Sequence, residues 1–159
     1  MYDILLKAQK GRMKYFEEGS IPDGKKIILI LGQPGIGKTW FLTYVLVRRL
    51  LKGKLTILQV GVSFIGDSRL SAAGHYLIDG NGFRQIDEVQ LFFERDKADI
   101  WVLAVETPFG LPRVASEHIW LAVVTSSPRE ANYKHLVKQY PPEKYYLSTW
   151  DWHEVVAAA

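Results

Sequence analysis

The residues with the clearest chemical potential lie in the stretch Gly32–Thr39, which reads Gly-Gln-Pro-Gly-Ile-Gly-Lys-Thr. The stretch fits the pattern G-x-x-x-x-G-K-[ST] of a phosphate-binding loop, the P-loop. Its glycines let the backbone curve around a phosphate, while the backbone N–H groups and the following helix N-terminus attract the anion. In this pattern Lys38 contacts the β- and γ-phosphates and Thr39 ligates Mg²⁺. ATP with Mg²⁺ is therefore the predicted ligand. Its predicted contacts are Gly32, Gln33, Pro34, Gly35, Ile36, Gly37, Lys38, Thr39 and Trp40.

The segments on either side of this loop have the character that a P-loop requires. Residues 26–31 form a short apolar run suited to a buried parallel strand. Residues 40–51 are long enough, and free enough of Gly and Pro, to form a helix. This helix is apolar almost all round, which predicts that it is covered on more than one side. The alternative is a glycine-rich turn with a chance lysine, and the order of strand, loop and helix favours the P-loop.

The composition indicates one domain without disulfides. The chain has 159 residues, of which 48% are apolar, and no cysteine. We see no secretory signal and no apolar run of membrane-spanning length, so we expect a soluble, intracellular protein. The net charge of +3 comes from scattered residues and gives no strong nucleic-acid signal. We interpret the densest basic cluster as a solvated last helical turn. It consists of Arg48, Arg49, Lys52 and Lys54.

Alternating apolar runs and turns predict the order of elements. We divide the chain into an N-terminal helix and turn (residues 1–24) and a P-loop NTPase domain (residues 25–159). After the predicted strand at 119–124, Ser127 and Glu130 fit a capping box with Pro128 at the first helical position, so a helix should begin there. The predicted helices span residues 2–17, 40–51, 86–95 and 127–139, and the predicted strands span 26–31, 55–60, 100–106, 119–124 and 144–149.

Two apolar runs end in a carboxylate that could be the Walker B partner of Mg²⁺. One run ends at Asp79 and the other at Glu106. A parallel crossover needs a dozen or more residues, usually a helix, and the segment before the first run is too short and loop-like. We therefore interpret residues 75–84 as a β-hairpin that turns at the sequence Asp-Gly-Asn-Gly. Glu106 is the favoured Walker B residue, and Asp79 is the alternative.

Together these elements predict an α/β fold with a mostly parallel, five-stranded sheet and helices on both faces. Ligands of such sheets bind at the carboxyl ends of the strands. Gly32, Glu106 and Thr125 all follow or end predicted strands, so they should meet at one nucleotide.

With these residues in view, the chain resembles the P-loop ATPase domain of Crinkler effectors and of retrotransposon hot spot (RHS) proteins. The resemblance covers roughly residues 25–156. It rests on the stretches GQPGIGKTWFLTYVLVRRLLKGK at 32–54, ILQ at 57–59, IWVLAVE at 100–106, VVTSSPRE at 123–130, NYKHLVK at 132–138 and YYLSTWDWHEV at 145–155.

The resemblance implies an additional-strand ATPase fold of the AAA/STAND type, with a strand inserted between the P-loop strand and the Walker B strand. It also implies a role in conflict between organisms, such as an effector acting in the cytoplasm or nucleus of a host. The chain departs from the family at Glu106, where the family usually carries Asp. The C-terminal helical lid of the family is also missing.

Two classes of function follow. In the first, the chain is an ATPase in which Glu106 holds Mg²⁺ or polarises water. Ser126 or Thr125 then senses the γ-phosphate, and Arg129 supplies positive charge in the transition state. In the second, it is a non-catalytic, nucleotide-dependent interaction protein. A small-molecule kinase is a third, weaker alternative.

The C-terminal end predicts an association site. Asp151 and Glu154 fit a second capping box, but a helix of about two turns is too short to be stable by itself in water. Trp150, Trp152 and Val155 would then either fold back on the sheet or stay partly exposed. We therefore expect self-association, or a host protein partner, at this end. Slow ATP turnover is expected as well, because no lid excludes water.

Overall fold

The structure is a computed structural model of the 159-residue chain. It describes residues 1–17, 27–60, 74–87, 90, 99–105 and 120–148, and within the first helix it describes the side chains of residues 1–11. The elements in chain order are α1 (Tyr2–Glu17), β1 (Ile27–Leu31), α2 (Lys38–Leu50), β2 (Thr56–Val60), β3 (Gly74–Asp79), β4 (Gly82–Ile86), β5 (Trp101–Val105), β6 (Leu121–Ser126), the 3₁₀ turn η2 (Glu130–Asn132), α5 (Lys134–Gln139) and β7 (Glu143–Tyr146).

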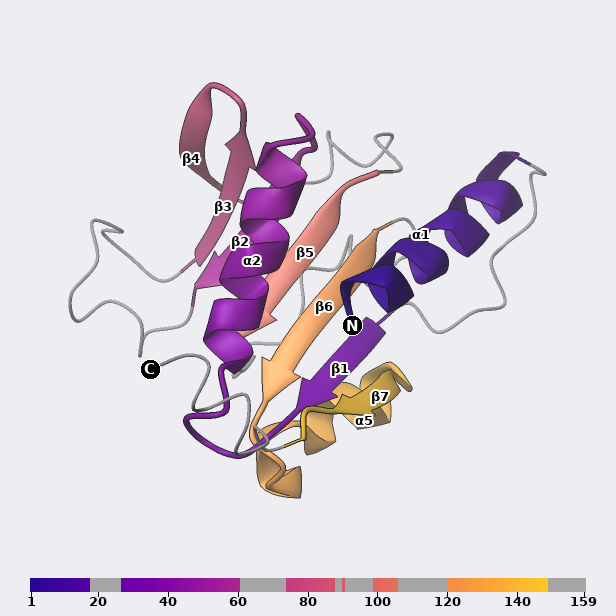
Figure 1. The fold of residues 1–159 in the computed structure, drawn as a ribbon, viewed down its shortest axis with the longest axis vertical. Coiled ribbons are helices and arrows are strands. Elements are labelled where there is room, and N and C mark those ends of the chain that lie inside the picture. Colours follow the sequence, from indigo (N-terminus) through magenta and orange to yellow (C-terminus); the bar gives the residue numbers. More distant parts are fainter. Residues whose placement is uncertain (18–26, 61–73, 88–89, 91–98, 106–119, 149–159) are drawn as a thin grey trace, which may run out of the picture.

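The described strands form one seven-stranded sheet in the order β4-β3-β2-β5-β6-β1-β7 (Figure 1). β2, β5, β6, β1 and β7 run parallel to one another. β3 pairs antiparallel with β2, and β4 pairs antiparallel with β3. The predicted five-stranded, mostly parallel sheet is thus corrected to a mixed sheet of seven strands. The predicted hairpin exists. Its strand β3 pairs with the side of β2 that faces away from β5, where the backbone groups of β2 would otherwise lack strand partners.

The position of β6 determines which strand ends lie beside the P-loop sequence. β6 lies between β1 and β5. Ile30 of β1 pairs with Thr125 of β6, which in turn pairs with Val105 of β5. The carboxyl ends of these strands therefore meet at one edge of the sheet.

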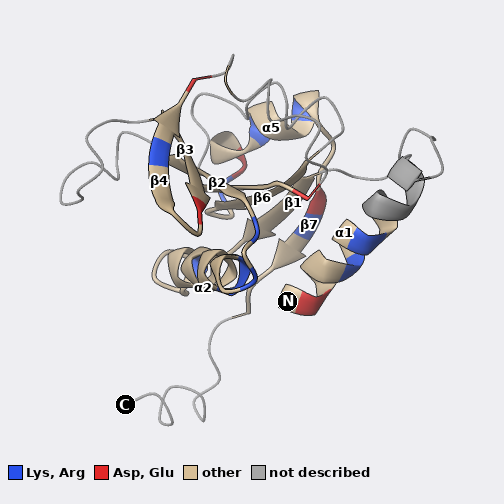
Figure 2. Cartoon of the chain, turned by 90° about the horizontal axis from the view of Figure 1, so that it is seen from above, with Lys and Arg blue, Asp and Glu red and all other residues tan. Residues whose placement is uncertain are grey.

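Helices cover both faces of the sheet, as predicted. Side chains alternate along β1, so Ile28 and Ile30 face one side while Leu29 faces the other. Leu5 of α1 and Leu42 of α2 are buried on the first side, and Leu136 of α5 is buried on the second. The view from above shows α2 and α5 on opposite sides of the strands (Figure 2). The helix predicted for residues 2–17 is confirmed, and its residue Leu5 shares the core of the sheet.

Three local predictions are wrong: the helix start at Ser127, the capping box at that start, and the helix start at Ile86. The predicted helix at Ser127 does not begin there: a short 3₁₀ turn comes first, and α5 begins at Lys134. Neither segment has a side-chain capping bond in the described chain, and the Ser127 hydroxyl instead accepts a bond from the Asn132 amide nitrogen at 2.6 Å. Ile86 ends β4 rather than starting a helix. Most of the helix predicted for residues 86–95 lies outside the described residues.

Arg49 corrects the picture of the basic cluster, because this cation is 4% exposed. Its Nε donates to the Thr56 hydroxyl at 3.0 Å, and its terminal nitrogen donates to the carbonyls of Leu55 and Asp99. Its guanidinium also lies 4.4 Å from the ring centre of Trp101. Arg49 thereby joins the end of α2 to the starts of β2 and β5.

Candidate functional site

The loop between β1 and α2 has the backbone shape that its glycines permit. Gly35 has a φ of 81° and Gly37 a φ of 92°, values that side chains with a Cβ rarely adopt. A Cβ on Gly32 would lie 2.8 Å from the Ile36 side chain, so this position also requires glycine. The loop starts at the end of the sheet, where the Gly32 N–H donates to the Ser126 carbonyl. These positions explain why glycine occurs three times in this stretch.

Lys38 lies across the loop and holds it closed. Its Nζ donates to the Gly32 carbonyl at 2.7 Å and to the Gln33 carbonyl at 2.9 Å. An ammonium group has three N–H donors, so these bonds leave one for an anion seated on the loop. The positive charge of Lys38 therefore lies beside the Gly32 and Gln33 carbonyls, at the start of the loop.

The start of α2 adds further positive potential. Gly37 is the N-cap residue, so no side chain of the described chain caps this helix. Its first N–H groups have no partners within the helix, and its first turn contains no acidic residue. Uncapped N–H groups at a helix start form a ready binding site for a phosphate. The Thr39 side chain is exposed in this first turn, where its hydroxyl is available as a metal ligand.

Two buried hydroxyls end the neighbouring strand. Thr125 and Ser126 of β6 are 0% and 1% exposed, and neither hydroxyl has a hydrogen-bond partner within the described chain. Ser126 pairs with Leu31 of β1, the residue just before the loop. A buried hydroxyl without a partner carries a free-energy cost of about 1–3 kcal/mol. Their position beside the loop is consistent with a polar role for at least one of them.

The two candidate Walker B carboxylates differ in position. Glu106 lies outside the described residues, but it directly follows Val105, which pairs with Thr125 at the carboxyl edge of the sheet. Asp79 ends β3, and its neighbour Ile78 pairs with Thr56 at the start of β2. Because β2 runs parallel to β5, β6 and β1, Asp79 lies at the opposite edge from Gly32. Its carboxylate accepts the Asn81 N–H of the hairpin turn at 2.7 Å, which gives it a structural role.

Arg129 is exposed in the turn that follows β6. It directly precedes the 3₁₀ turn η2. The side chain of Trp40, a predicted nucleotide contact, is 79% exposed on the outer side of α2. The structure therefore brings the loop, Thr125 and Ser126 together, and it leaves the Trp40 side chain and Asp79 apart from them.

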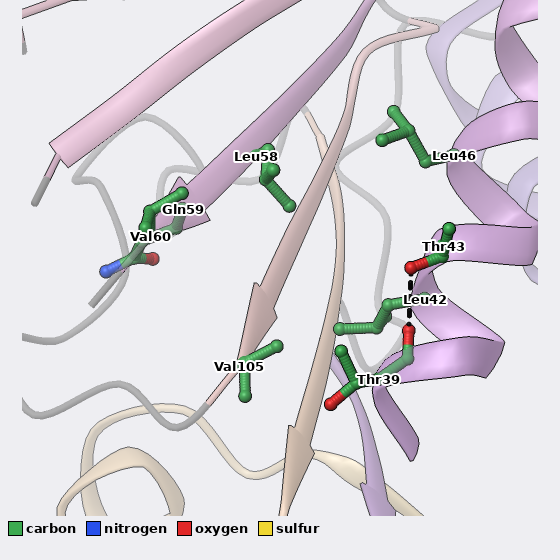
Figure 3. A pocket seen from close by; sticks show the side chains of 8 residues that line it. All are labelled: Thr39, Leu42, Thr43, Leu46, Leu58, Gln59, Val60 and Val105. Atoms are coloured by element: carbon green, nitrogen blue, oxygen red, sulfur yellow. Dashed lines mark hydrogen bonds between the residues drawn. The ribbon is translucent and has the colours of Figure 1, made fainter. Parts of the chain in front are cut away.

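An apolar cavity of about 110 Å³ adjoins the loop on the α2 face. It is lined by Leu42 and Leu46 of α2 and by Leu58, Val60 and Val105 of the sheet, with Thr39 at one end (Figure 3). Such a lining suits apolar groups better than phosphates. The cavity borders the glycine loop, and its lining is mostly apolar rather than a set of polar groups for a phosphate.

Leu147 is a site residue that the sequence analysis missed. Its N–H donates to the Leu31 carbonyl at 2.8 Å, and its Cβ lies 3.4 Å from the point where a Gly32 Cβ would sit. It follows β7, so it comes to the loop from a sequence distance of more than one hundred residues. The sequence predicted a strand at residues 144–149, but nothing in that pattern indicated which residues the strand would contact.

The described residues contain neither a metal-binding cluster of histidine and acidic side chains nor a helix able to cross a membrane. A Mg²⁺ ion bound with nucleotide needs few protein ligands, because phosphates and water supply the others. The exposed hydroxyl of Thr39 fits that requirement.

Comparison with protein families and with curated proteins gives no match. Among solved structures, the chain is similar to PCH-2 from C. elegans, with a TM-score of 0.51 and 15% sequence identity. The similarity covers 94% of this chain and 42% of the PCH-2 chain. The chain thus spans less than half the length of that protein. At this identity the likeness concerns the fold alone, which is a mixed α/β fold consistent with an NTPase-like one.

Proposed function

We propose that the chain binds ATP with Mg²⁺ on residues 32–39 and hydrolyses it slowly. The observation that carries the proposal is the loop itself, in which left-handed Gly35 and Gly37, the Lys38 ammonium and the uncapped start of α2 converge. Each feature favours a bound polyphosphate for a separate physical reason. The NTPase-like fold supports nucleotide binding at a coarse level.

In this proposal each residue of the carboxyl edge has one task. Lys38 neutralises the β- and γ-phosphate oxygens, and Thr39 contributes a hydroxyl to Mg²⁺, which stabilises charge on the leaving phosphates. Glu106 orients water or a metal-bound water from the end of β5. Thr125 or Ser126 donates to the γ-phosphate, which would give its buried hydroxyl a partner. Arg129, exposed after β6, adds positive charge to the same edge.

We propose a nucleotide-binding module of the Crinkler and RHS type, which would act as an effector in a host cell. The stretches that carry this resemblance include the loop and the turn after β6, and both lie at the candidate site.

A non-catalytic, nucleotide-dependent interaction protein is the second candidate. The observation that favours it is an apolar surface on α2, where Trp40 and Leu51 are both 79% exposed. Such residues at helical spacing are typical of a surface that contacts another segment or protein. Phosphate release with ATP distinguishes the two candidates, because an interaction protein would bind nucleotide without releasing phosphate.

The test of the proposed Mg²⁺ site compares two carboxylate variants. We expect Glu106→Gln to reduce the gain in ATP affinity that Mg²⁺ provides by about tenfold, since one charge-assisted interaction is lost. Asp79→Asn should leave this gain unchanged, because Asp79 lies at the other edge of the sheet. Calorimetric titration of ATP with and without Mg²⁺ measures both. An effect of Asp79→Asn alone would contradict the assignment of Glu106.

A further inference from the structure

One face of α2 presents apolar side chains that the fold leaves open. The face, here called the α2 stripe, consists of Trp40, Tyr44, Val47 and Leu51, which follow one another at intervals of four, three and four residues. Their exposed fractions are 79%, 48%, 47% and 79%. This spacing places all four on one side of the helix, over a length of roughly 16 Å. Tyr2 of α1 contacts Tyr44 from one flank and still leaves it half exposed.

The flank of the stripe is basic. Arg48 and Lys52 are exposed, and their cationic groups lie 5.6 and 5.8 Å from the ring centre of Tyr2. A segment that fits this surface needs an apolar face of similar width and acidic residues beside it. Both requirements narrow the choice of occupant.

The sequence after Ser148 meets both requirements. Trp152, Val155 and Val156 have the spacing i, i+3, i+4 of one helical face. Asp151 directly precedes Trp152 and Glu154 directly precedes Val155, and both acidic residues would occupy an adjacent face.

The described chain also leads this segment to the start of the stripe. Leu147 packs into the core on the α2 side of the sheet, together with Leu42 and Val45 of α2. The Lys38 side chain and the Leu147 Cβ lie 3.7 and 3.4 Å from the same point above Gly32. Lys38 begins α2 and Trp40 follows it by two residues, so the described chain ends at Ser148 close to the end of the helix at which the stripe begins. Eight helical residues extend about 12 Å, which matches most of its length.

We propose that residues 149–159 dock on the α2 stripe of the same chain. Trp152, Val155 and Val156 cover the exposed apolar side chains, and the acidic residues face Arg48 and Lys52. This proposal is independent of nucleotide binding. It assigns to the C-terminal apolar residues an intramolecular partner in place of a second copy or a host protein.

Disulfide trapping tests the docking directly, because the chain has no cysteine of its own. Val47→Cys combined with Val155→Cys should form an intramolecular disulfide under mild oxidation, since docking would bring the two Cα atoms within bonding range. The control combines Phe83→Cys with Val155→Cys, because Phe83 is 59% exposed on β4 at the far edge of the sheet. We expect the first pair to form an intramolecular disulfide at least about tenfold faster than the control, by its higher effective concentration.

Two further variants define the outcome. Tyr44→Cys with Val155→Cys samples the preceding helical turn and should also form an intramolecular disulfide faster than the control. Adding Arg48→Glu and Lys52→Glu to the first pair should slow its reaction severalfold, because the acidic residues then meet like charge.

Equal intramolecular rates in the test and control pairs would overturn the proposal. Disulfide-linked dimers as the main product at low micromolar concentration would overturn it in favour of a second copy. Circular dichroism of each reduced variant verifies the fold.

Discussion

Lys38→Ala is expected to weaken ATP binding by about a hundredfold or more. The substitution removes a charge-assisted hydrogen bond and the neutralisation of the phosphates, which together are worth about 3 kcal/mol. It also removes the bonds that hold the Gly32 and Gln33 carbonyls over the loop. The side chain has no place in either core cluster of the described chain, so we expect the fold to persist.

Calorimetric titration of ATP with Mg²⁺ into the wild type and the variant measures this effect. Lys52→Ala is the matched control, because Lys52 is an exposed lysine that follows the other end of α2. It removes the same charge without touching the loop, so its ATP affinity should stay within about twofold of the wild type. Equal losses in the two variants would reduce the role of Lys38 to general electrostatics.

Arg49→Met is expected to lower the free energy of unfolding by about 3 kcal/mol. Methionine keeps an apolar stem against Trp101, but it leaves the Thr56 hydroxyl and the Leu55 and Asp99 carbonyls without their donor. Each buried acceptor left unpaired costs about 1–3 kcal/mol. Arg48→Met is the control, because that neighbouring arginine is exposed and should change stability by less than about 1 kcal/mol.

Urea unfolding followed by circular dichroism measures both arginine variants. Burial lowers the pKa of Arg49 to about 10, an effect partly opposed by the nearby Asp99 and Tyr2. The guanidinium therefore stays protonated at neutral pH, and the comparison reports on the charged, hydrogen-bonded side chain. Equal stability of the two variants would mean that the bonds of Arg49 contribute little to holding α2 on the sheet.

The parts of the fold that the sequence predicted well depend on local patterns. The run from residue 27 to 31 is apolar at every position, and such a run is buried on both faces of the sheet. The hairpin turn at Gly80 and Asn81 follows from two residues that suit a tight turn. In the same way, the P-loop pattern specifies glycine at position 37, where the structure has a positive φ of 92°.

The errors arise where contacts between distant residues decide the outcome. Arg49 has the sequence context of a solvated cation, but Asp99 and Thr56 approach it only in the folded chain. The α2 helix seemed apolar all round, but the sheet covers the Leu42 and Val45 face and leaves Trp40 exposed. Likewise, Ser127 satisfies its hydroxyl through Asn132 rather than through a helix cap, which sequence spacing cannot distinguish.

The central claim is that residues 32–39 bind the phosphates of ATP. Amide NMR of the ¹⁵N-labelled wild type, titrated with ATP and Mg²⁺, tests this claim most directly. We predict that the largest shifts fall on the N–H groups of Gly35, Gly37, Lys38 and Thr39. The N–H signals of β3 and β4, which are separated from β1 by other strands of the sheet, should not shift. Shifts confined to other elements, or no shifts at about 5 mM ATP, above the range of typical substrate affinities, would contradict the proposed nucleotide site.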